Sequence, residues 1–242
     1  MSWLDLPRVP ELEVMDDSDE VEAYSSAAAQ AYLDKIDDTF VEHAVRLVAG
    51  RSRGRALDIG TGPGQIVLKL ARRLPGWQFV GVDRSPNMIR QARVAAGLSP
   101  ASSLLVGAPL AAPSNEARVQ FFVADGNRLP FPAESFDLVI CNSVLHHLAQ
   151  PQRLLNEVAR LVKRDGAVLI RDLRRPSRLA YPLHVRWYGR HYTGLMGKLY
   201  CASVRSAYTV AELEALLRSS PLTGARVFRH ERTHLGLERS VG

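Results

Sequence analysis

The feature that most constrains the fold of this chain is the glycine-rich stretch at residues 58–66, Asp-Ile-Gly-Thr-Gly-Pro-Gly-Gln-Ile. A short apolar stretch that begins at Arg55 precedes it and predicts a buried strand, and the apolar spacing of residues 66–71 predicts a helix after it. Glycine permits a tight turn and a close approach to a ligand, and a helix N-terminus offers unpaired N–H groups. The stretch therefore predicts a nucleotide-cofactor site at a strand-to-helix turn.

The glycine spacing distinguishes between cofactors. Gly60, Gly62 and Gly64 alternate, whereas a dinucleotide fingerprint has the pattern Gly-x-Gly-x-x-Gly. Gln65 stands where that pattern needs its third glycine. NAD is therefore disfavoured.

Further predicted strands also end in polar residues. The strand at 77–83 ends in Asp83, an acid that can accept two ribose hydroxyls. The strand at 119–123 precedes Asp125, and the strand at 136–141 precedes Asn142. Because the carboxyl ends of parallel strands meet at one crevice, we expect Asp58 to border the same pocket as these three residues.

From residue 58 to about residue 172, the sequence resembles the class I, Rossmann-like, S-adenosylmethionine-dependent methyltransferases of the type 11 group. The motifs that carry the resemblance are Asp58-x-Gly60-x-Gly62-x-Gly64, Asp83, Asp125-Gly126, Leu129-Pro130-Phe131-Pro132, Ser135-Phe136-Asp137 and Leu145-His146-His147-Leu148. The resemblance implies S-adenosyl-L-methionine as cofactor and S-adenosyl-L-homocysteine as product. It places the methionine part at the glycine loop, the ribose at Asp83 and the adenine beside Asp125 and Gly126. The cofactor-binding residues that it implies are Asp58, Gly60, Thr61, Gly62, Gly64, Asp83, Arg84, Met88, Asp125, Gly126, Asn142 and Ser143.

The expected fold is α/β: a doubly wound, mostly parallel, seven-stranded Rossmann-like sheet with helices on both faces. At 242 residues and 46% hydrophobic content, the chain is expected to form a single domain with one substantial core. We divide it into an acidic helical lead-in at 1–50, a cofactor-binding core at 51–172, a cap insertion after the fifth strand at 173–208, and a C-terminal part at 209–242. In that last part, Thr209 and Glu212 predict a helix with a capping box, followed by strands at 225–228 and 234–237.

Charge is unevenly distributed along the chain. Residues 1–42 hold twelve acids and two bases, whereas the rest holds 29 bases and 13 acids. The lead-in could therefore dock over the basic pocket rim as a lid, or form a solvated tail, and its apolar spacing favours docking. Between Gly97 and Arg118, the sequence predicts a flexible insertion.

The sequence contains no signal-like segment and no run of 18 apolar residues, so we expect a cytoplasmic protein without a membrane partner. Its two cysteines, Cys141 and Cys201, are too few for a disulfide framework or a zinc site, and Cys141 is expected to be a buried thiol. No metal site is expected. The oligomeric state is left open.

The cap insertion is basic and aromatic. Between residues 171 and 205 there are eight bases and one acid, and five tyrosine and tryptophan residues are interleaved with them. Such arginines can hold a carboxylate or phosphate of a small substrate, follow an RNA backbone, or form a solvated surface. Asp172 could orient an acceptor or pair with Arg171. The candidate substrate residues are Arg171, Asp172, Arg174, Tyr192 and Tyr208.

His146 and His147 follow the fourth strand at the predicted crevice, where an imidazole could remove a proton from the acceptor. They could equally shape the floor of the pocket. Adjacent histidines on a helix point in different directions, which disfavours joint metal ligation. Methyl transfer mainly requires alignment and exclusion of water, so a base is needed only where the acceptor must lose a proton.

Together these features predict methyl transfer from S-adenosylmethionine to a small metabolite, with an anionic metabolite as one option. An RNA methyltransferase is the alternative within enzymes, although the chain has Asn142-Ser143-Val144-Leu145 where nucleic-acid base methyltransferases usually carry Asn/Asp-Pro-Pro-Tyr. A regulatory protein that binds the cofactor without turnover is the alternative outside enzymes, because the glycine loop reports binding only.

Overall fold

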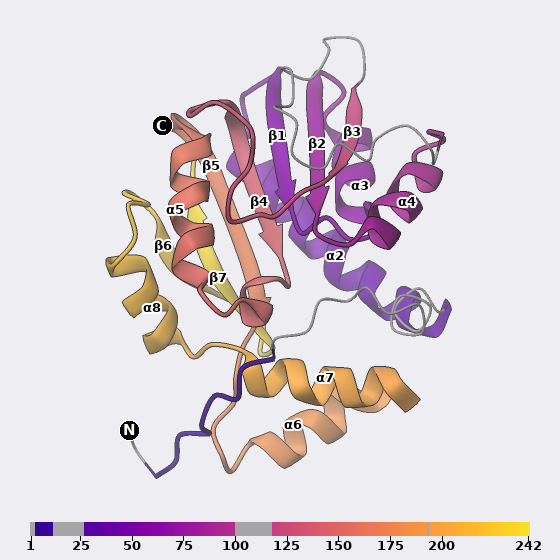
Figure 1. Ribbon diagram of the computed structural model, residues 1–242. Helices are drawn as coiled ribbons and strands as arrows, with labels where there is room; N and C mark the ends of the chain where they lie inside the picture. The colour runs from indigo at the N-terminus through magenta and orange to yellow at the C-terminus, as the bar shows by residue number, and fades with distance from the viewer. Residues whose placement is uncertain (1–2, 12–26, 100–117, 193) are drawn as a thin grey trace.

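The computed structural model describes residues 3–11, 27–99, 118–192 and 194–242. Strands and helices alternate along the chain, as expected for an α/β protein (Figure 1). The strands are β1 (Gly54–Ile59), β2 (Trp77–Asp83), β3 (Val119–Val123), β4 (Phe136–Asn142), β5 (Val162–Leu173), β6 (Arg226–His230) and β7 (His234–Arg239). The α-helices are α2 (Ala27–Leu47), α3 (Gln65–Arg73), α4 (Pro86–Ala95), α5 (Pro151–Leu161), α6 (Tyr181–Tyr188), α7 (Gly194–Ser206) and α8 (Val210–Arg218). Two 3₁₀ turns, η1 (Leu145–His147) and η2 (Gly189–His191), complete the elements.

The seven strands form one sheet in the order β3-β2-β1-β4-β5-β7-β6. All pairs from β3 to β5 are parallel, and β7 runs antiparallel to both β5 and β6. The predicted mostly parallel, seven-stranded sheet is thereby confirmed. β5 extends from Val162 to Leu173 and so includes Arg171 and Asp172.

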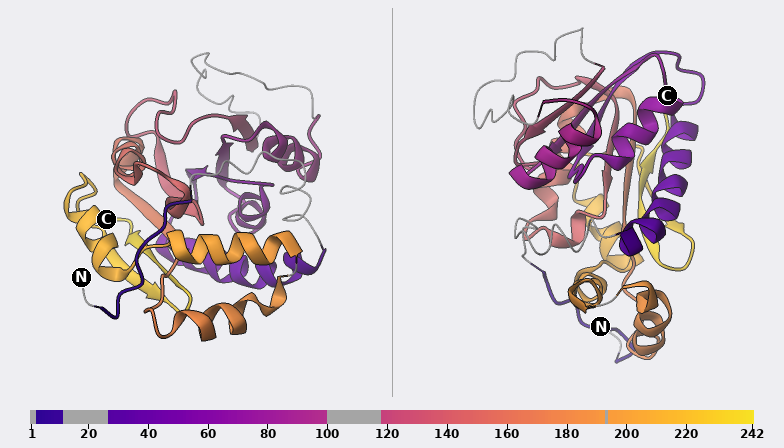
Figure 2. Two further views of the ribbon diagram at one scale, coloured as in Figure 1. Left: turned by 60° about the horizontal axis from the view of Figure 1, so that its bottom comes forward. Right: turned by 90° about the vertical axis from the view of Figure 1, so that its right-hand side faces the viewer.

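Helices cover both faces of the sheet because successive strand residues point to opposite sides. On β1, Leu57 and Ile59 join a core with α5 and α8, whereas Ala56 joins a second core with α2, α3 and α4. Figure 2 shows α2 lying along one face of the sheet. The sheet is therefore doubly wound, as expected.

The second half of the acidic lead-in docks on the core as α2. Phe40 and Val41 are buried against apolar residues of α3. On the outer side, Asp38 pairs with Lys69 at 2.8 Å and Glu42 with Arg73 at 2.6 Å. The lead-in residues 12–26 and most of the predicted insertion, at 100–117, lie outside the described residues. The four-part division of the chain, including a lid role for the lead-in, stays a prediction.

The cap, α6 to α7, lies at the end of the sheet to which the parallel strands point (Figure 1). The N-terminal residues 3–11 run alongside it: Val9 N donates to Arg205 O at 3.1 Å and Arg178 N donates to Leu4 O at 2.9 Å. The predicted capping box of α8 is present, with Thr209 and Glu212 each accepting from the other's backbone N–H. Among the described helices, none is long and apolar enough to cross a membrane.

Phe121 on β3 provides a test of the core. Its ring fills the space that Cβ atoms on Gly64 and Gly81 would need, and it is fully buried. Phe121→Ala should therefore lower the free energy of unfolding by about 3–5 kcal/mol, measured by urea denaturation. Val94→Ala, at an exposed site on α4, is the matched control and should change it by less than about 0.5 kcal/mol. A small loss at Phe121 would contradict this packing.

Candidate active site

A cavity of about 630 Å³ opens at the carboxyl ends of β1, β2, β3 and β4, between the sheet and the cap. This is the edge where an open α/β sheet places its ligands. The strand ends contribute polar groups, and the cap contributes apolar and aromatic ones. The lining includes Gly60, Gly62, Asp83, Arg84, Ser85, Met88, Asp125, Gly126, Asn142 and Ser143 on the sheet side, and Tyr192, Met196, Leu199, Tyr200 and Ser203 on the cap side.

The glycine loop between β1 and α3 depends on left-handed backbone. Gly60, Gly62 and Gly64 have φ values of +75°, +52° and +80°. A Cβ on Gly60 would lie 2.2 Å from Val144, and one on Gly64 would lie 2.8 Å from Phe121. A Cβ on Gly62 would meet no protein atom within 4 Å, and Gly62 lines the cavity. Gly62 thus leaves room for a ligand against the backbone, which fits the expected cofactor.

Asp83 holds this loop in place from the end of β2. Its Oδ2 accepts from Gly62 N at 2.8 Å, and its Oδ1 accepts from Ser85 N at 2.9 Å. Ser85 in turn caps α4 by accepting from Met88 N at 3.2 Å. The carboxylate therefore connects the glycine loop to α4 at the cavity wall.

His146 is held by a buried carboxylate. Its Nδ1 lies 2.6 Å from Asp172 Oδ1, and its backbone N donates to Asp172 Oδ2 at 2.9 Å. Burial alone would raise the pKa of Asp172, but His146 and the backbone donors hold that pKa below its usual value. Nδ1 thus faces Asp172, whereas Nε2 is buried and has no hydrogen-bond partner among the described residues, on a side chain that lines the cavity.

His147 shares this part of the cavity. The two histidine rings lie 3.9 Å apart with planes tilted by 39°, so the expectation that they diverge is wrong. They are consecutive residues of the 3₁₀ turn η1, and both line the cavity. Burial, together with His146, lowers the pKa of His147 to about 3, which keeps this imidazole neutral.

Glu11 approaches His147, with Oε2 3.9 Å from Nδ1. Ligand atoms of Glu11, His146 and His147 all lie within 4.8 Å of one another. Tetrahedral ligands at zinc distances are about 3.4 Å apart, so a metal would require these side chains to move closer. The expectation of no metal site stays a prediction.

Arg171 and Asp172 do not pair with each other, although pairing was the expected alternative to a substrate role. They are consecutive on β5 and point to opposite faces. Arg171 donates to Asn142 Oδ1 at 3.0 Å, to Ile36 O at 3.0 Å and to Thr39 Oγ1 at 2.9 Å. Burial lowers the pKa of Arg171 to about 10, so the guanidinium remains charged. It fastens α2 to the sheet.

The predicted site residues fall into two groups. Those that line the cavity are Gly60, Gly62, Asp83, Arg84, Met88, Asp125, Gly126, Asn142, Ser143, His146, His147 and Tyr192. Asp58, Thr61, Gly64, Arg171, Asp172, Arg174 and Tyr208 do not line it. The Asp58 side chain on β1 is buried. The Arg174 guanidinium donates to Arg232 O, and the Arg8 guanidinium lies over the Tyr208 ring. Asp58, which we expected to border the pocket, is only 2% exposed and does not line the cavity, and its role toward the cofactor stays a prediction.

Sequence reasoning missed the side chains with which α7 lines the cavity. Met196, Leu199, Tyr200 and Ser203 form that wall, and Tyr200 stacks near Tyr192 at 5.1 Å. The spacing of 196, 199, 200 and 203 is that of one helix face, a signal present in the sequence. Only the placement of α7 over the strand ends assigns this face to the cavity.

Three comparisons with known proteins agree with this geometry. A family described as a methyltransferase domain matches residues 57–170. A ubiquinone/menaquinone biosynthesis C-methyltransferase of Syntrophotalea carbinolica is 30% identical over 192 residues, which cover 78% of this chain and 74% of that relative. A demethylmenaquinone methyltransferase of Thermus thermophilus is 30% identical over 159 residues, which cover 64% of each. A solved S-adenosylmethionine-dependent methyltransferase from Aquifex aeolicus matches with a TM-score of 0.60 at 16% identity, covers 93% of this chain and 99% of its own, and shows the same fold.

Asp58 should make stability depend on pH. Burial raises the pKa of Asp58 to about 7, and the nearby Asp83 adds to the shift. The unfolded value is near 3.8, so its stabilising contribution is present below that pH and is lost as the pH rises toward 7. Asp58→Asn should therefore gain stability relative to wild type by up to about 1.4 kcal/mol per pH unit between pH 5 and 7, measured by urea unfolding. Glu214→Gln, at an exposed acid on α8, is the control and should show no such trend. A constant difference between Asp58→Asn and wild type would contradict the burial argument.

Proposed function

The chain belongs to the class I, Rossmann-like S-adenosylmethionine-dependent methyltransferases, and we propose that it methylates an apolar aromatic acceptor of the quinol type. The observation that carries this proposal is the composition of the cavity. Polar strand ends face one side, and Tyr192, Met196, Leu199 and Tyr200 face the other. The first side suits the cofactor, and the second suits a flat apolar ring.

S-adenosyl-L-methionine is the cofactor, and the residues present fit it. Gly62 leaves open space against the loop backbone, and Asp83 lines the cavity beside it. Asp125, Gly126 and Met88 line the adjacent wall, where the adenine would be held. When bound, S-adenosylmethionine supplies an electrophilic methyl group on a sulfonium sulfur, and S-adenosylhomocysteine is the product.

The acceptor side offers few charges. Of the eight bases between residues 171 and 205, for which binding of a small anionic substrate was one of three alternatives, none lines the cavity. Among the described residues, the arginines that line it are Arg84 and Arg153, both outside the cap. Arg171 and Arg175 are buried, and both donate hydrogen bonds to other groups of the protein. Arg175 donates to Leu6 O at 2.8 Å and to the Glu212 carboxylate. An anionic acceptor therefore has less support than an apolar one. The demethylmenaquinone and ubiquinone/menaquinone methyltransferase names of two relatives point to the same chemical class.

His146 is the residue that we assign to proton transfer. A quinol hydroxyl becomes a better nucleophile, at oxygen or at the neighbouring ring carbon, when its proton leaves. Nε2 of His146 accepts that proton, and the Asp172 carboxylate at 2.6 Å from Nδ1 stabilises the imidazolium that forms. The neutral His147 ring and the apolar cap exclude water from the same space.

Asp83→Ala tests the proposed binding of the cofactor at Asp83. Asp83 lines the cavity and is expected to accept two ribose hydroxyls, and each such hydrogen bond contributes about 0.5–1.5 kcal/mol net. Their loss should weaken S-adenosylmethionine and S-adenosylhomocysteine binding roughly 10- to 100-fold. Calorimetric titration measures the affinities, with NAD as a ligand that should not bind. Glu214→Ala should bind as wild type does. Unchanged affinity in Asp83→Ala would refute the role given to this carboxylate.

Transfer of a labelled methyl group tests the proposed class of methyl acceptor. A short-chain demethylmenaquinol should be methylated in preference to a carboxylate metabolite of similar size. His146→Gln should lower kcat for the quinol by about 10²- to 10⁴-fold and leave the affinity for S-adenosylmethionine unchanged. His191→Gln, at an exposed position on η2, is the control. Preference for the carboxylate, or full activity in His146→Gln, would contradict the proposal.

A further inference from the structure

Apolar side chains are exposed mainly on the cap. Leu179, Leu183 and Trp187 are 65%, 73% and 62% exposed, and they follow one another at intervals of four residues. Leu183 and Trp187 are one turn apart on α6, so they lie on the same face of that helix. Leu179 lies in the turn that precedes α6. Trp3, 73% exposed, belongs to the segment that the bond from Arg178 N to Leu4 O holds beside that turn. We call this surface the outer cap face.

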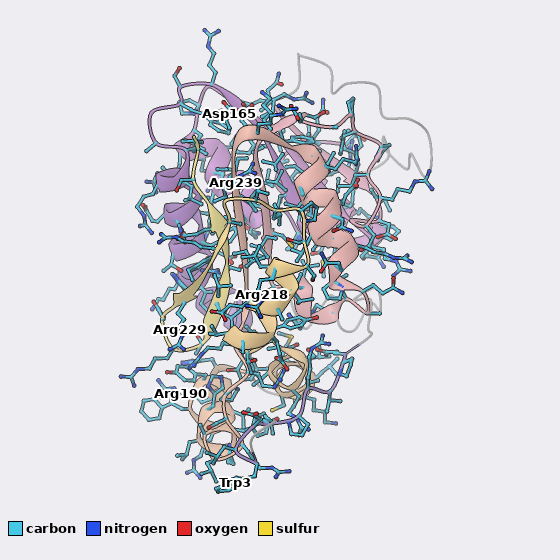
Figure 3. All side chains as sticks on the ribbon, turned by 90° about the vertical axis from the view of Figure 1, so that its left-hand side faces the viewer. Trp3, Asp165, Arg190, Arg218, Arg229 and Arg239 are labelled. Carbon is cyan, nitrogen blue, oxygen red and sulfur yellow. The ribbon has the colours of Figure 1, made fainter. Side chains whose placement is uncertain are left out.

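The outer cap face is also basic. Arg178, Arg186 and Arg190 are exposed within it, and the Arg190 guanidinium lies 4.4 Å from the centroid of the Trp187 ring. No acid occurs between Asp172 and Glu212 in the sequence. In the neighbouring segment 3–11, Asp5 is the exposed acid. Figure 3 shows Trp3 and Arg190 at the same end of the molecule, opposite Asp165.

From this combination, we propose that the outer cap face docks the protein on the surface of a lipid bilayer that contains anionic lipids. Tryptophan and leucine side chains on a short helix enter the boundary between headgroups and acyl chains, and arginines beside them bind anionic headgroups. The protein would lie on the membrane without crossing it. This adds a membrane partner where the sequence predicted none.

Charge distinguishes this occupant from a second copy of the chain. A two-fold contact brings a surface against itself, so the arginines of one copy would face those of the other. Stable interfaces also bury about 800 Å² on each partner, which is more than the exposed side of an eight-residue helix provides. An anionic surface meets no such repulsion.

The outer cap face and the cavity are two sides of one structure. α7 lies between them: Tyr200 lines the cavity, and its hydroxyl lies 3.3 Å from Nε2 of His184 on α6. A lipophilic acceptor dissolved in the bilayer would be close to the cavity when the face is docked, a consequence that rests on the proposed function. Docking itself requires neither cofactor nor acceptor and is tested without them.

The test is co-sedimentation of the full chain with vesicles of phosphatidylcholine, with and without phosphatidylglycerol. The wild type should partition at least tenfold more strongly to the phosphatidylglycerol vesicles, and added salt should weaken it. Leu183→Glu/Trp187→Glu should lower that partition at least tenfold, and Arg186→Gln/Arg190→Gln should lower it on the anionic vesicles alone. Val94→Glu adds one negative charge, half of that in the double glutamate variant, to an exposed apolar site on α4 and should bind as wild type does.

Thermal unfolding and calorimetric affinity for S-adenosylmethionine show that the variants remain folded. Three results would overturn docking: no vesicle binding by wild type, equal binding by Leu183→Glu/Trp187→Glu and wild type, or equal loss in Val94→Glu. A wild-type dimer in sedimentation analysis that the double variant lacks, without vesicle binding, would assign the face to a second copy instead. Failure of methyl transfer to a quinol would leave the vesicle result unaffected, so the two proposals fail separately.

Discussion

Two buried charges at the end of β5 determine how the rest of the site is arranged. Arg171 and Asp172 are each about 1% exposed, and a buried charge is tolerated only where partners satisfy it. Arg171 finds them in α2 and in Asn142, and Asp172 finds them in His146. At the end of β5, Arg171 thereby holds α2 against one face of the sheet, and Asp172 orients the His146 imidazole on the other face.

The two sides of the cavity are built differently. The side at the strand ends is set by the backbone of the glycine loop, where Gly60 and Gly62 have positive φ, and by Asp83, which accepts from Gly62 N and Ser85 N. Such a wall has little freedom, which suits a cofactor of fixed shape. The opposite side is made of side chains from α7, among them Met196, Leu199 and Tyr200. Under the proposed function, the cofactor and the acceptor would therefore contact separate parts of the fold.

The sheet and the glycine loop could be predicted from the sequence because their signals are local. The strands β1, β2 and β4 are short, largely apolar runs with polar residues at or just after their carboxyl ends, and the loop requires glycine at positions with positive φ. The capping box of α8 is equally local. By contrast, the predictions for Arg171, Arg174 and Asp58 relied on composition or on position at a strand end, and neither reveals which way a side chain points.

The sequence by itself determined the class of fold, the position of the cofactor loop and the acids that follow it, because backbone geometry and hydrophobic periodicity act over a few residues. Only the tertiary structure decided that Asp172 pairs with His146, that Arg174 and Arg175 donate to carbonyl groups of the protein itself, and that α7 completes the cavity. These contacts join residues far apart in the chain, such as Ile36 with Arg171. They depend on how helices pack over the sheet, which no local pattern encodes.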